Sequence, residues 1–382
     1  MFFVVDNSQE TPVNRVDENI TDECFNSDTE LPQAFPVVDL TVPPCVREIT
    51  IQRSNVLKSM ISEFSATDIL QCNVMFVFMG DQGIPEMGRG AGVTREVLSL
   101  FWREFSVALA IGASEKVPSI RHDYQKSEWL SVARIIAFGF KEENYFPLFL
   151  SRAFMASCLY GEEALTKECL LDSFNSYVSK DEQETVKKCL QGEIDPEDDD
   201  VLDLLSSYKC YRKPSKENIQ VILEELAHQE LVQKPRYIAN AWSVELQSLK
   251  TYPEFHDFNS MSVMYVEKKP SSKRIIKLLD IELKSDSERA CFDHLKRYIK
   301  SLDDNMLAGF LQFITGSDII TVERIKVSFN ATEGITRAIV AHTCGPVLEL
   351  SSTYQTYNEL SEELSNTLRN CFAWSFVIVY IT

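Results

Sequence analysis

The chain has 382 residues, which at about 150 residues per domain is enough for two or three folded units. Hydrophobic residues make up 45% and charged residues 25%, proportions that exclude a fibrous or wholly disordered chain. The formal net charge of −19 opposes binding to phosphate backbones and anionic lipids, because both are bound mainly by cationic side chains. We therefore expect no nucleic-acid partner and no membrane partner.

The cysteines and histidines show no metal-binding pattern. None of the 10 cysteines stands in a Cys-x-x-Cys pair, and the 5 histidines supply no ligand spacing. We expect no metal and no cofactor, and thiols that stay free in a reducing compartment. The apolar run from Phe372 to Ile381 is shorter than the roughly 20 residues that cross a bilayer, and the N-terminus lacks the basic region of a signal peptide. The cytoplasm or the nucleus is the expected location.

The first 45 residues are acidic and rich in proline. Arg15 is their only basic residue. Such a composition buries too little apolar surface to offset the entropy lost on folding, so we predict a disordered or extended leader over residues 1–45. A second acidic run, from Glu193 to Asp200, is interpreted as a solvated loop, with docking of a basic partner as the alternative.

Apolar spacing predicts a helix-rich region from residue 46 to residue 267. A strand over Val74–Met79 precedes a glycine-rich loop, and a helix begins near Thr94 and is stopped by Gly112. Further helices are predicted from an apolar stripe that begins at Trp129 and from a segment capped by Ser215.

The glycine-rich loop lies where a phosphate-binding loop would lie. Its stretch Gly88-Arg-Gly-Ala-Gly92 lacks the Lys-Ser/Thr pair that such a loop uses. We interpret these glycines as turn-forming, and a phosphate site is the alternative.

A polar, basic, proline-containing break at Lys268–Arg274 separates this region from a smaller one. The elements predicted beyond the break are helices at residues 291–302 and 307–314, strands at residues 325–329, 338–341 and 347–350, and a helix capped by Thr356 and Glu359. Together they form a compact mixed domain of about 110 residues. We predict an α+β fold with a linker or hinge at the break.

One cysteine lies where a strand opens into a loop. The apolar segment Ile339–Ala341 continues into His342, Thr343 and Cys344 and is interrupted at once by Gly-Pro, since proline cannot continue an interior strand. Accessible functional groups are usually held at such positions. If the strand persists to Cys344, His342 and Cys344 lie on one face, where the imidazole favours the reactive thiolate. A half-buried cysteine beside a surface histidine is the alternative.

Four other cysteines fall in predicted helices, where a free cysteine most often behaves as a small core hydrophobe. They are Cys158, Cys169, Cys189 and Cys291. We expect these thiols to serve packing rather than chemistry.

Three motifs match one known family in its order. Val77–Asp81 with Gly90–Glu96 is similar to a strand, a Gly-Glu loop and a Gly-Gly-x-x-Arg-Glu helix start. Phe310–Ser317 is similar to a Leu-x-Phe-x-Thr-Gly-Ser segment, and Ala341–Cys344 to a Thr-Cys catalytic motif. These motifs resemble those of HECT-type ubiquitin ligases, and the resemblance covers the chain from about Val46 to its end.

The resemblance implies a bilobal α+β fold, with a large helical N-lobe over residues 46–267 and a small α/β C-lobe over residues 268–382, joined by a flexible hinge. It also implies an enzyme that transfers ubiquitin in two acyl-transfer steps. Cys344 takes ubiquitin from a ubiquitin-conjugating enzyme as a thioester and passes it to a lysine of a protein substrate. His342 and Thr343 occupy flanking, supporting positions. Ubiquitin, the conjugating enzyme and the substrate are then the expected partners.

Two other functions compete with this one. Asp81 stands where the family usually has Glu, and Ser351-Ser352 where it has Leu-Pro, so a HECT-like module that binds ubiquitin or its conjugating enzyme without turnover is one alternative. A cysteine hydrolase is the other, but it requires a third group to orient His342, and the sequence identifies none.

Overall fold

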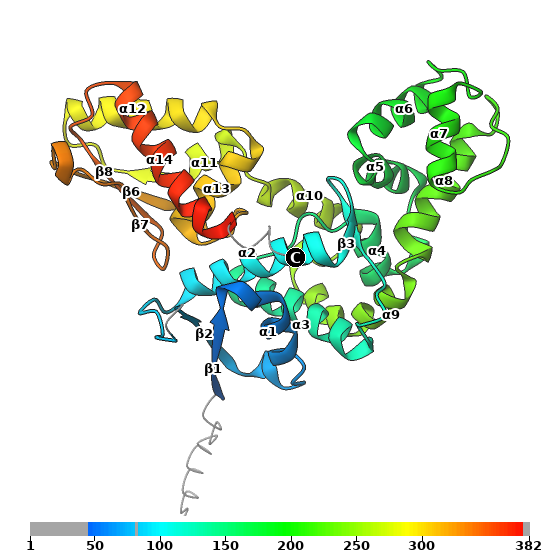
Figure 1. The fold of residues 1–382 in the computed structure, drawn as a ribbon, viewed down its shortest axis with the longest axis horizontal. Coiled ribbons are helices and arrows are strands. Elements are labelled where there is room, and N and C mark those ends of the chain that lie inside the picture. The colour runs from blue at the N-terminus through cyan, green and yellow to red at the C-terminus, as the bar shows by residue number, and fades with distance from the viewer. Residues whose placement is uncertain (1–44, 81–82, 377–382) are drawn as a thin grey trace, which may run out of the picture. The chain divides into compact units, whose positions relative to one another are not determined.

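The computed structural model describes residues 45–80 and 83–376, with side chains up to residue 369 except that of residue 335. The contacts of the chain divide it into two units, residues 1–43 and 44–382. The predictions for residues 1–44, for Asp81 and for the side chains of the run that begins at Phe372 fall outside this part. In the second unit, the order of the elements can be followed in Figure 1.

The described chain is a mixed α+β protein in which helices predominate, which confirms the α+β class. The helices are α1 Val56–Glu63, α2 Ala91–Ala108, α3 Lys126–Glu143, α4 Arg152–Tyr160, α5 Lys167–Tyr177, α6 Lys180–Gln191, α7 Asp199–Ser207, α8 Ile219–His228, α9 Arg236–Glu245, α10 Phe258–Lys268, α11 Ser272–Leu278, α12 Asp286–Ser301, α13 Asp304–Thr315 and α14 Tyr357–Phe376. The strands are β1 Val46–Gln52, β2 Asn73–Met79, β3 Ala110–Gly112, β4 Lys116–Pro118, β5 Leu279–Ile281, β6 Ile325–Asn330, β7 Val340–His342 and β8 Val347–Ser351.

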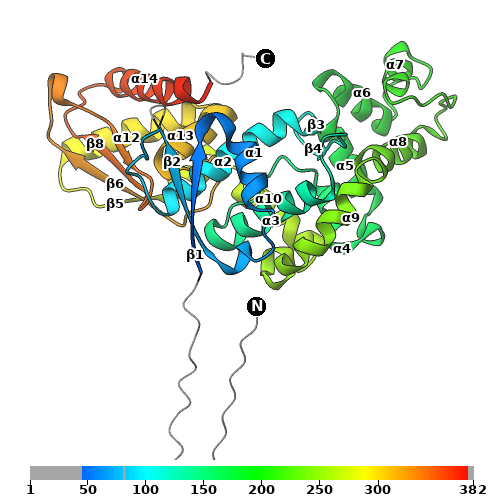
Figure 2. The ribbon, with the colours of Figure 1, turned by 60° about the horizontal axis from the view of Figure 1, so that its bottom comes forward.

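The helical region, residues 46–268, begins with a parallel two-stranded ribbon. β1 and β2 pair so that Val46 faces Asn73 and Gln52 faces Met79, and Figure 2 shows the two strands side by side. β2 agrees with the predicted strand, whereas β1 was not predicted. Only two of its seven side chains are buried, Ile49 and Ile51, and two alternating apolar residues give a weak strand signal.

Helix α2 differs at both ends from the predicted helix. It begins at Ala91 because its N-cap, Gly90, has φ 93°, a backbone conformation that glycine adopts without steric cost. It ends at Ala108, before Gly112, because residues 110–112 leave the helix to pair with β4 as an antiparallel strand. The apolar face of α2 lies in the core of the helical region.

Phe105 of α2 lies at the centre of an aromatic cluster. Its ring centroid is 5.2 Å from that of Trp102, 6.4 Å from that of Trp129 in α3, and 6.4 Å from that of Trp242 in α9. All four side chains are buried. Such inclined aromatic pairs stabilise a core beyond the area they bury, so this cluster fixes α2, α3 and α9 against one another.

Helices α5, α6, α7 and α8 group together within the helical region (Figure 1). The acidic run Glu193–Asp200 is predicted to be a loop, but its last three residues belong to the start of α7. Asp198 caps the helix, and Asp199 and Asp200 form its first turn, where the helix dipole favours negative charge. The cap predicted at Ser215 is also displaced. α8 begins at Ile219, because Ser215 donates its N–H to Asn218 Oδ1 in the turn before it.

The sheet region, residues 269–376, is built on a four-stranded sheet with strand order β5-β6-β8-β7. β6 is parallel to β5 and to β8, and β7 is antiparallel to β8. Helices α12, α13 and α14 pack with this sheet around a separate apolar cluster from Ile275 to Leu368. Thr356 accepts a hydrogen bond from Glu359 N at the start of α14, as predicted, but the Glu359 carboxylate returns to Gln355 N.

The break predicted at Lys268–Arg274 is shorter in the structure. α10 ends at Lys268 and α11 begins at Ser272, capped by Ser271, so residues 269–271 alone connect the two regions. The two apolar clusters divide at the same place, with one exception. Ile319, from the segment that follows α13, belongs to the cluster of the helical region.

Lys268 gives a testable pH dependence at this junction. Its ammonium donates to the backbone oxygen and the Oδ1 atom of Asn144, and burial lowers its pKa to about 8. The unfolded chain therefore binds more protons than the folded chain between about pH 8 and the ordinary lysine value, and folding should gain up to about 3 kcal/mol across that window as pH rises. Urea denaturation at stepped pH gives the free energy of unfolding of wild type and Lys268→Met, and the two proteins should differ in the slope of that free energy against pH. Lys269→Met, at an exposed position, is the control and should keep the wild-type slope.

Candidate active site around Cys344

Cys344 lies in the turn that joins β7 to β8. The strands are paired up to His342 and Val347, and Pro346 in the turn accepts a hydrogen bond from Lys326 N of β6 at 2.9 Å. The thiol is therefore exposed on a turn whose two ends are anchored in the sheet. This confirms the predicted place of Cys344 at the end of a strand, and the thiol is exposed rather than half-buried.

His342 does not share a strand face with Cys344, because β7 ends at His342 and the following residues form the turn. The prediction that the two side chains share a face required the strand to continue to Cys344, and it does not. Instead, His342 Nε2 lies 3.1 Å from Glu349 Oε1, and both side chains are about half exposed. No hydrogen bond joins His342 to Cys344 in the described part of the chain. The sequence did not identify a carboxylate for His342. The structure places Glu349 of β8 beside it, but the pair has no contact with the thiol.

Thr343 is held by a buried arginine of the helical region. Arg95 of α2 is only 6% exposed, and its guanidinium donates from Nη2 to Thr343 O at 2.5 Å and from Nε to Thr315 O at 2.7 Å. Its third nitrogen, Nη1, pairs with Glu143 Oε2 at 2.7 Å. One side chain therefore binds the candidate active-site turn, the end of α13 and the end of α3.

A second set of contacts continues from Arg95 along α2. The Ser99 hydroxyl lies 3.1 Å from Gly316 O and 3.2 Å from Asp318 Oδ1, and Tyr145 donates its hydroxyl to the same carboxylate oxygen at 2.8 Å. Burial raises the pKa of Asp318, while the hydrogen bonds from Tyr145 and Ser99 oppose that rise. The carboxylate is thus satisfied by donors on the opposite region.

Glycines allow the two regions to approach this closely. A Cβ atom on Gly92 would lie 2.6 Å from the carbonyl carbon of Thr343, and one on Gly316 would collide with the backbone of Gly92. One on Gly90 would lie 3.8 Å from Cys344 Sγ. We call this set of contacts the seam: Arg89, Gly90, Gly92, Arg95 and Ser99 of the helical region against Thr315–Asp318 and Thr343–Cys344 of the sheet region.

The thiol itself takes part in the seam. Cys344 Sγ–H donates to the backbone oxygen of Arg89 at 2.9 Å, and Arg89 in turn donates to Gly88 O within its own loop. The glycines of this loop were interpreted from the sequence as turn-forming. The positive φ at Gly90 agrees with that interpretation, and the seam adds a role in close packing that the sequence did not indicate.

The other cysteines have a different environment. Cys158, Cys169, Cys189 and Cys291 are buried within helices, which confirms their prediction as packing residues. Burial raises the pKa of Cys169 and that of Cys291 to about 12, and it raises the pKa of Cys158 further. Burial therefore opposes the reactive thiolate at these positions.

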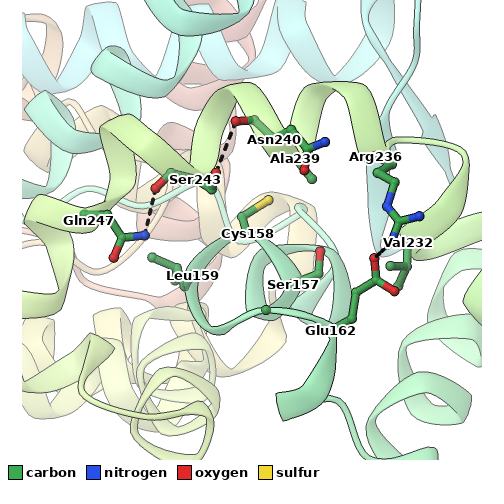
Figure 3. A pocket seen from close by; sticks show the side chains of 11 residues that line it. Ser157, Cys158, Leu159, Glu162, Val232, Arg236, Ala239, Asn240, Ser243 and Gln247 are labelled. Atoms are coloured by element: carbon green, nitrogen blue, oxygen red, sulfur yellow. Dashed lines mark hydrogen bonds and ion pairs between the residues drawn. The ribbon is translucent and has the colours of Figure 1, made fainter.

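A pocket of about 290 Å³ lies between α4 and α9 and contains one of these buried cysteines (Figure 3). Glu162, which lines the pocket, pairs with Arg236 and lies 3.4 Å from His228. Cys158 lines the pocket, but burial disfavours its thiolate. The arrangement offers a cavity of mixed polar and apolar lining without an activated nucleophile, and it does not compete with Cys344 as a site for acyl transfer.

The fold and the turn together define a mixed α+β protein with an exposed, anchored thiol next to a glycine-rich helix start. Within residues 45–80 and 83–376, no three His, Cys, Asp or Glu side chains are arranged to hold a metal ion. None of the described helices combines the length and apolarity needed to cross a bilayer. Scanning the chain against protein-family models and searching the curated proteins with it found no match.

Arg95, Glu143, Ser99 and Asp318 were not identified as site residues from the sequence. Arg95 lies in the Gly90–Glu96 motif, and membership of this motif is the one feature of the sequence that points to a role for it at the site. Arginine inside the apolar stripe of an amphipathic helix must find partners for its guanidinium when it is buried. The sequence does not say which carbonyl oxygens those partners are.

Proposed function

We propose that this chain is a HECT-type ubiquitin-protein ligase with Cys344 as the acceptor of ubiquitin. The observation that carries the proposal is the exposed thiol of Cys344 on an anchored strand-to-strand turn. Cys45, directly before β1, is the other exposed cysteine among those whose side chains are described. Only Cys344 combines exposure with the His-Thr-Cys sequence that resembles the catalytic motif.

The chemistry consists of two acyl transfers. The Cys344 thiolate attacks the thioester carbonyl between ubiquitin and the conjugating enzyme, a new carbon–sulfur bond forms, and the thiolate of the conjugating enzyme leaves. A substrate lysine amine then attacks the Cys344 thioester, loses a proton, and releases the Cys344 thiolate. Exchange of one thioester for another is close to neutral in free energy, so the first step depends on access, orientation and thiolate fraction.

A bilobal domain follows from the same proposal. The helical region corresponds to an N-lobe over residues 46–267, and the sheet region to a C-lobe over residues 268–382. Separate apolar clusters and a connection of three residues support this division. A connection of three residues can act as a hinge between two packed bodies.

The eight cysteines whose side chains the structure describes are all free thiols, which is consistent with a reducing location. We infer residence in the cytoplasm or the nucleus, where ubiquitin and its conjugating enzymes would be the partners. The net charge of −19 favours partner proteins with basic surfaces over nucleic acid.

The experiment is a charging assay. The full chain is incubated with a panel of ubiquitin-loaded conjugating enzymes, and the products are separated with and without a thiol reductant. A ligase gives a ubiquitin adduct that the reductant removes. A folded chain that forms no adduct across the panel contradicts the proposal, and measurable binding of ubiquitin or the conjugating enzyme in that case would identify the non-catalytic module.

A further inference from the structure

We propose that the seam is a latch that closes on the free thiol of Cys344 and opens when Cys344 carries an acyl group. The inference rests on the proposed function for the identity of that group, ubiquitin, but its physical basis is independent. The latch would couple the loading of Cys344 to the release of the sheet region from α2.

The first argument is the hydrogen on sulfur. Cys344 Sγ donates to Arg89 O at 2.9 Å, and only a thiol has that hydrogen to give. In a thioester the hydrogen is replaced by a carbonyl carbon, so the bond to Arg89 O cannot form. The Arg89 oxygen and the new acyl group would then occupy the same space, and a lost bond would become a steric conflict.

The second argument is the closeness of the surfaces on either side of the sulfur. A Cβ atom on Gly90 would already lie 3.8 Å from Cys344 Sγ, and one on Gly92 would overlap the Thr343 backbone. An acyl carbon in place of the sulfur's hydrogen would point at Arg89 O, 2.9 Å from the sulfur, and the tight contact between Gly92 and Thr343 limits how far the turn can yield. Since packed interfaces separate rather than deform, the seam is expected to open as a unit.

The third argument is what keeps the latch closed. Arg95 binds backbone oxygens of Thr315 and Thr343, and Asp318 accepts from Ser99 and Tyr145 across the same interface. These groups are satisfied by water once the regions separate, so opening exchanges one set of hydrogen bonds for another at modest net cost. The clash at the acylated sulfur is then sufficient to shift the equilibrium.

A wedge tests the latch without ubiquitin. Gly92→Ala adds a methyl group that must displace Thr343, whereas alanine suits the α2 helix better than glycine does. Gly88→Ala, in the loop just before α2, is the matched control, because its Cβ atom makes an ordinary 3.4 Å contact with Val93. Iodoacetamide alkylation is followed at each cysteine by mass spectrometry, with Cys45 as the exposed internal reference.

We expect Gly92→Ala to raise the alkylation rate of Cys344, relative to Cys45, several-fold over wild type, and Gly88→Ala to leave the ratio unchanged. An unchanged ratio in a folded Gly92→Ala protein would overturn the latch. A second measurement uses the wild-type chain, in case the wedge variant does not fold. Hydrogen exchange at residues 91–95 and 315–318 is compared before and after alkylation of Cys344.

Alkylated protein should lose protection in both segments, because alkylation removes the sulfur's hydrogen and adds bulk. Cys344→Ser, which keeps a donor, should retain the wild-type protection. Equal protection in free and alkylated protein would refute the latch even if the charging assay succeeds. Conversely, loss of protection on alkylation together with no ubiquitin adduct would uphold the latch and refute the ligase, so the two proposals fail separately.

Discussion

Replacing Cys344 by alanine is expected to abolish the ubiquitin adduct completely, because no other side chain on the turn can form a thioester. Cys344→Ser is more informative. Its hydroxyl attacks slowly, since it stays protonated at neutral pH, but any product is an oxygen ester. We therefore expect a weak adduct that survives thiol reductant and is cleaved by mild alkali. Gel separation under reducing, non-reducing and alkaline conditions distinguishes wild type from the two variants.

The matched control for this experiment is Cys45→Ala. Cys45 is also exposed, so its removal tests whether exposure alone accounts for acyl transfer. The adduct should form at the wild-type rate. An adduct that persists in Cys344→Ala and disappears in Cys45→Ala would show that Cys45 accepts ubiquitin, and it would refute Cys344 as the acceptor.

Replacing Arg95 by leucine is expected to destabilise the fold by about 3–5 kcal/mol, because it leaves the buried Glu143 carboxylate without its counter-charge. The side chains of the pair are only 7% and 10% exposed, so water cannot replace the lost partner fully. Urea denaturation of the full chain at neutral pH measures the change.

The pH dependence of the Arg95→Leu destabilisation shows whether the unpaired Glu143 carboxylate causes it. Burial raises the pKa of Glu143 while Arg95 opposes that rise, so in Arg95→Leu burial acts alone and the pKa rises further. The destabilisation of Arg95→Leu is fully present above the raised pKa of Glu143. It falls as pH drops through that pKa, because the carboxyl group is then buried in its neutral form. The double variant Arg95→Leu with Glu143→Leu should recover much of the loss. An equal loss in the double variant would show that packing of Arg95, and not charge, is what matters.

The fold was predictable from the sequence where the signal is local. The α+β class and the strand at Val74–Met79 follow from apolar periodicity, which a short window of residues contains. The start of α2 was placed three residues late, because the capping conformation of Gly90 has no apolar signature. β1 was missed for a related reason: it is a strand because β2 lies beside it, and its own pattern is weak.

For the candidate site, the sequence indicated Cys344 and its place at the end of a strand, since Gly-Pro after the thiol is a local stop. It also proposed a role for His342 on the same face. The turn begins directly after His342, so alternation ends there, and the carboxylate of Glu349 becomes its partner across β7 and β8.

The sequence by itself determined the elements with a strong local apolar pattern, the four packing cysteines and the position of one exposed thiol, because each depends on residues within a few positions of one another. Only the tertiary structure decided what meets that thiol. Arg95 and Thr343 are 248 residues apart in the chain and joined by one hydrogen bond, and Gly92 matters because the backbone of Thr343 lies against it. Such contacts arise from how two regions pack, and no local pattern of residue types encodes which backbone oxygen a buried guanidinium will find.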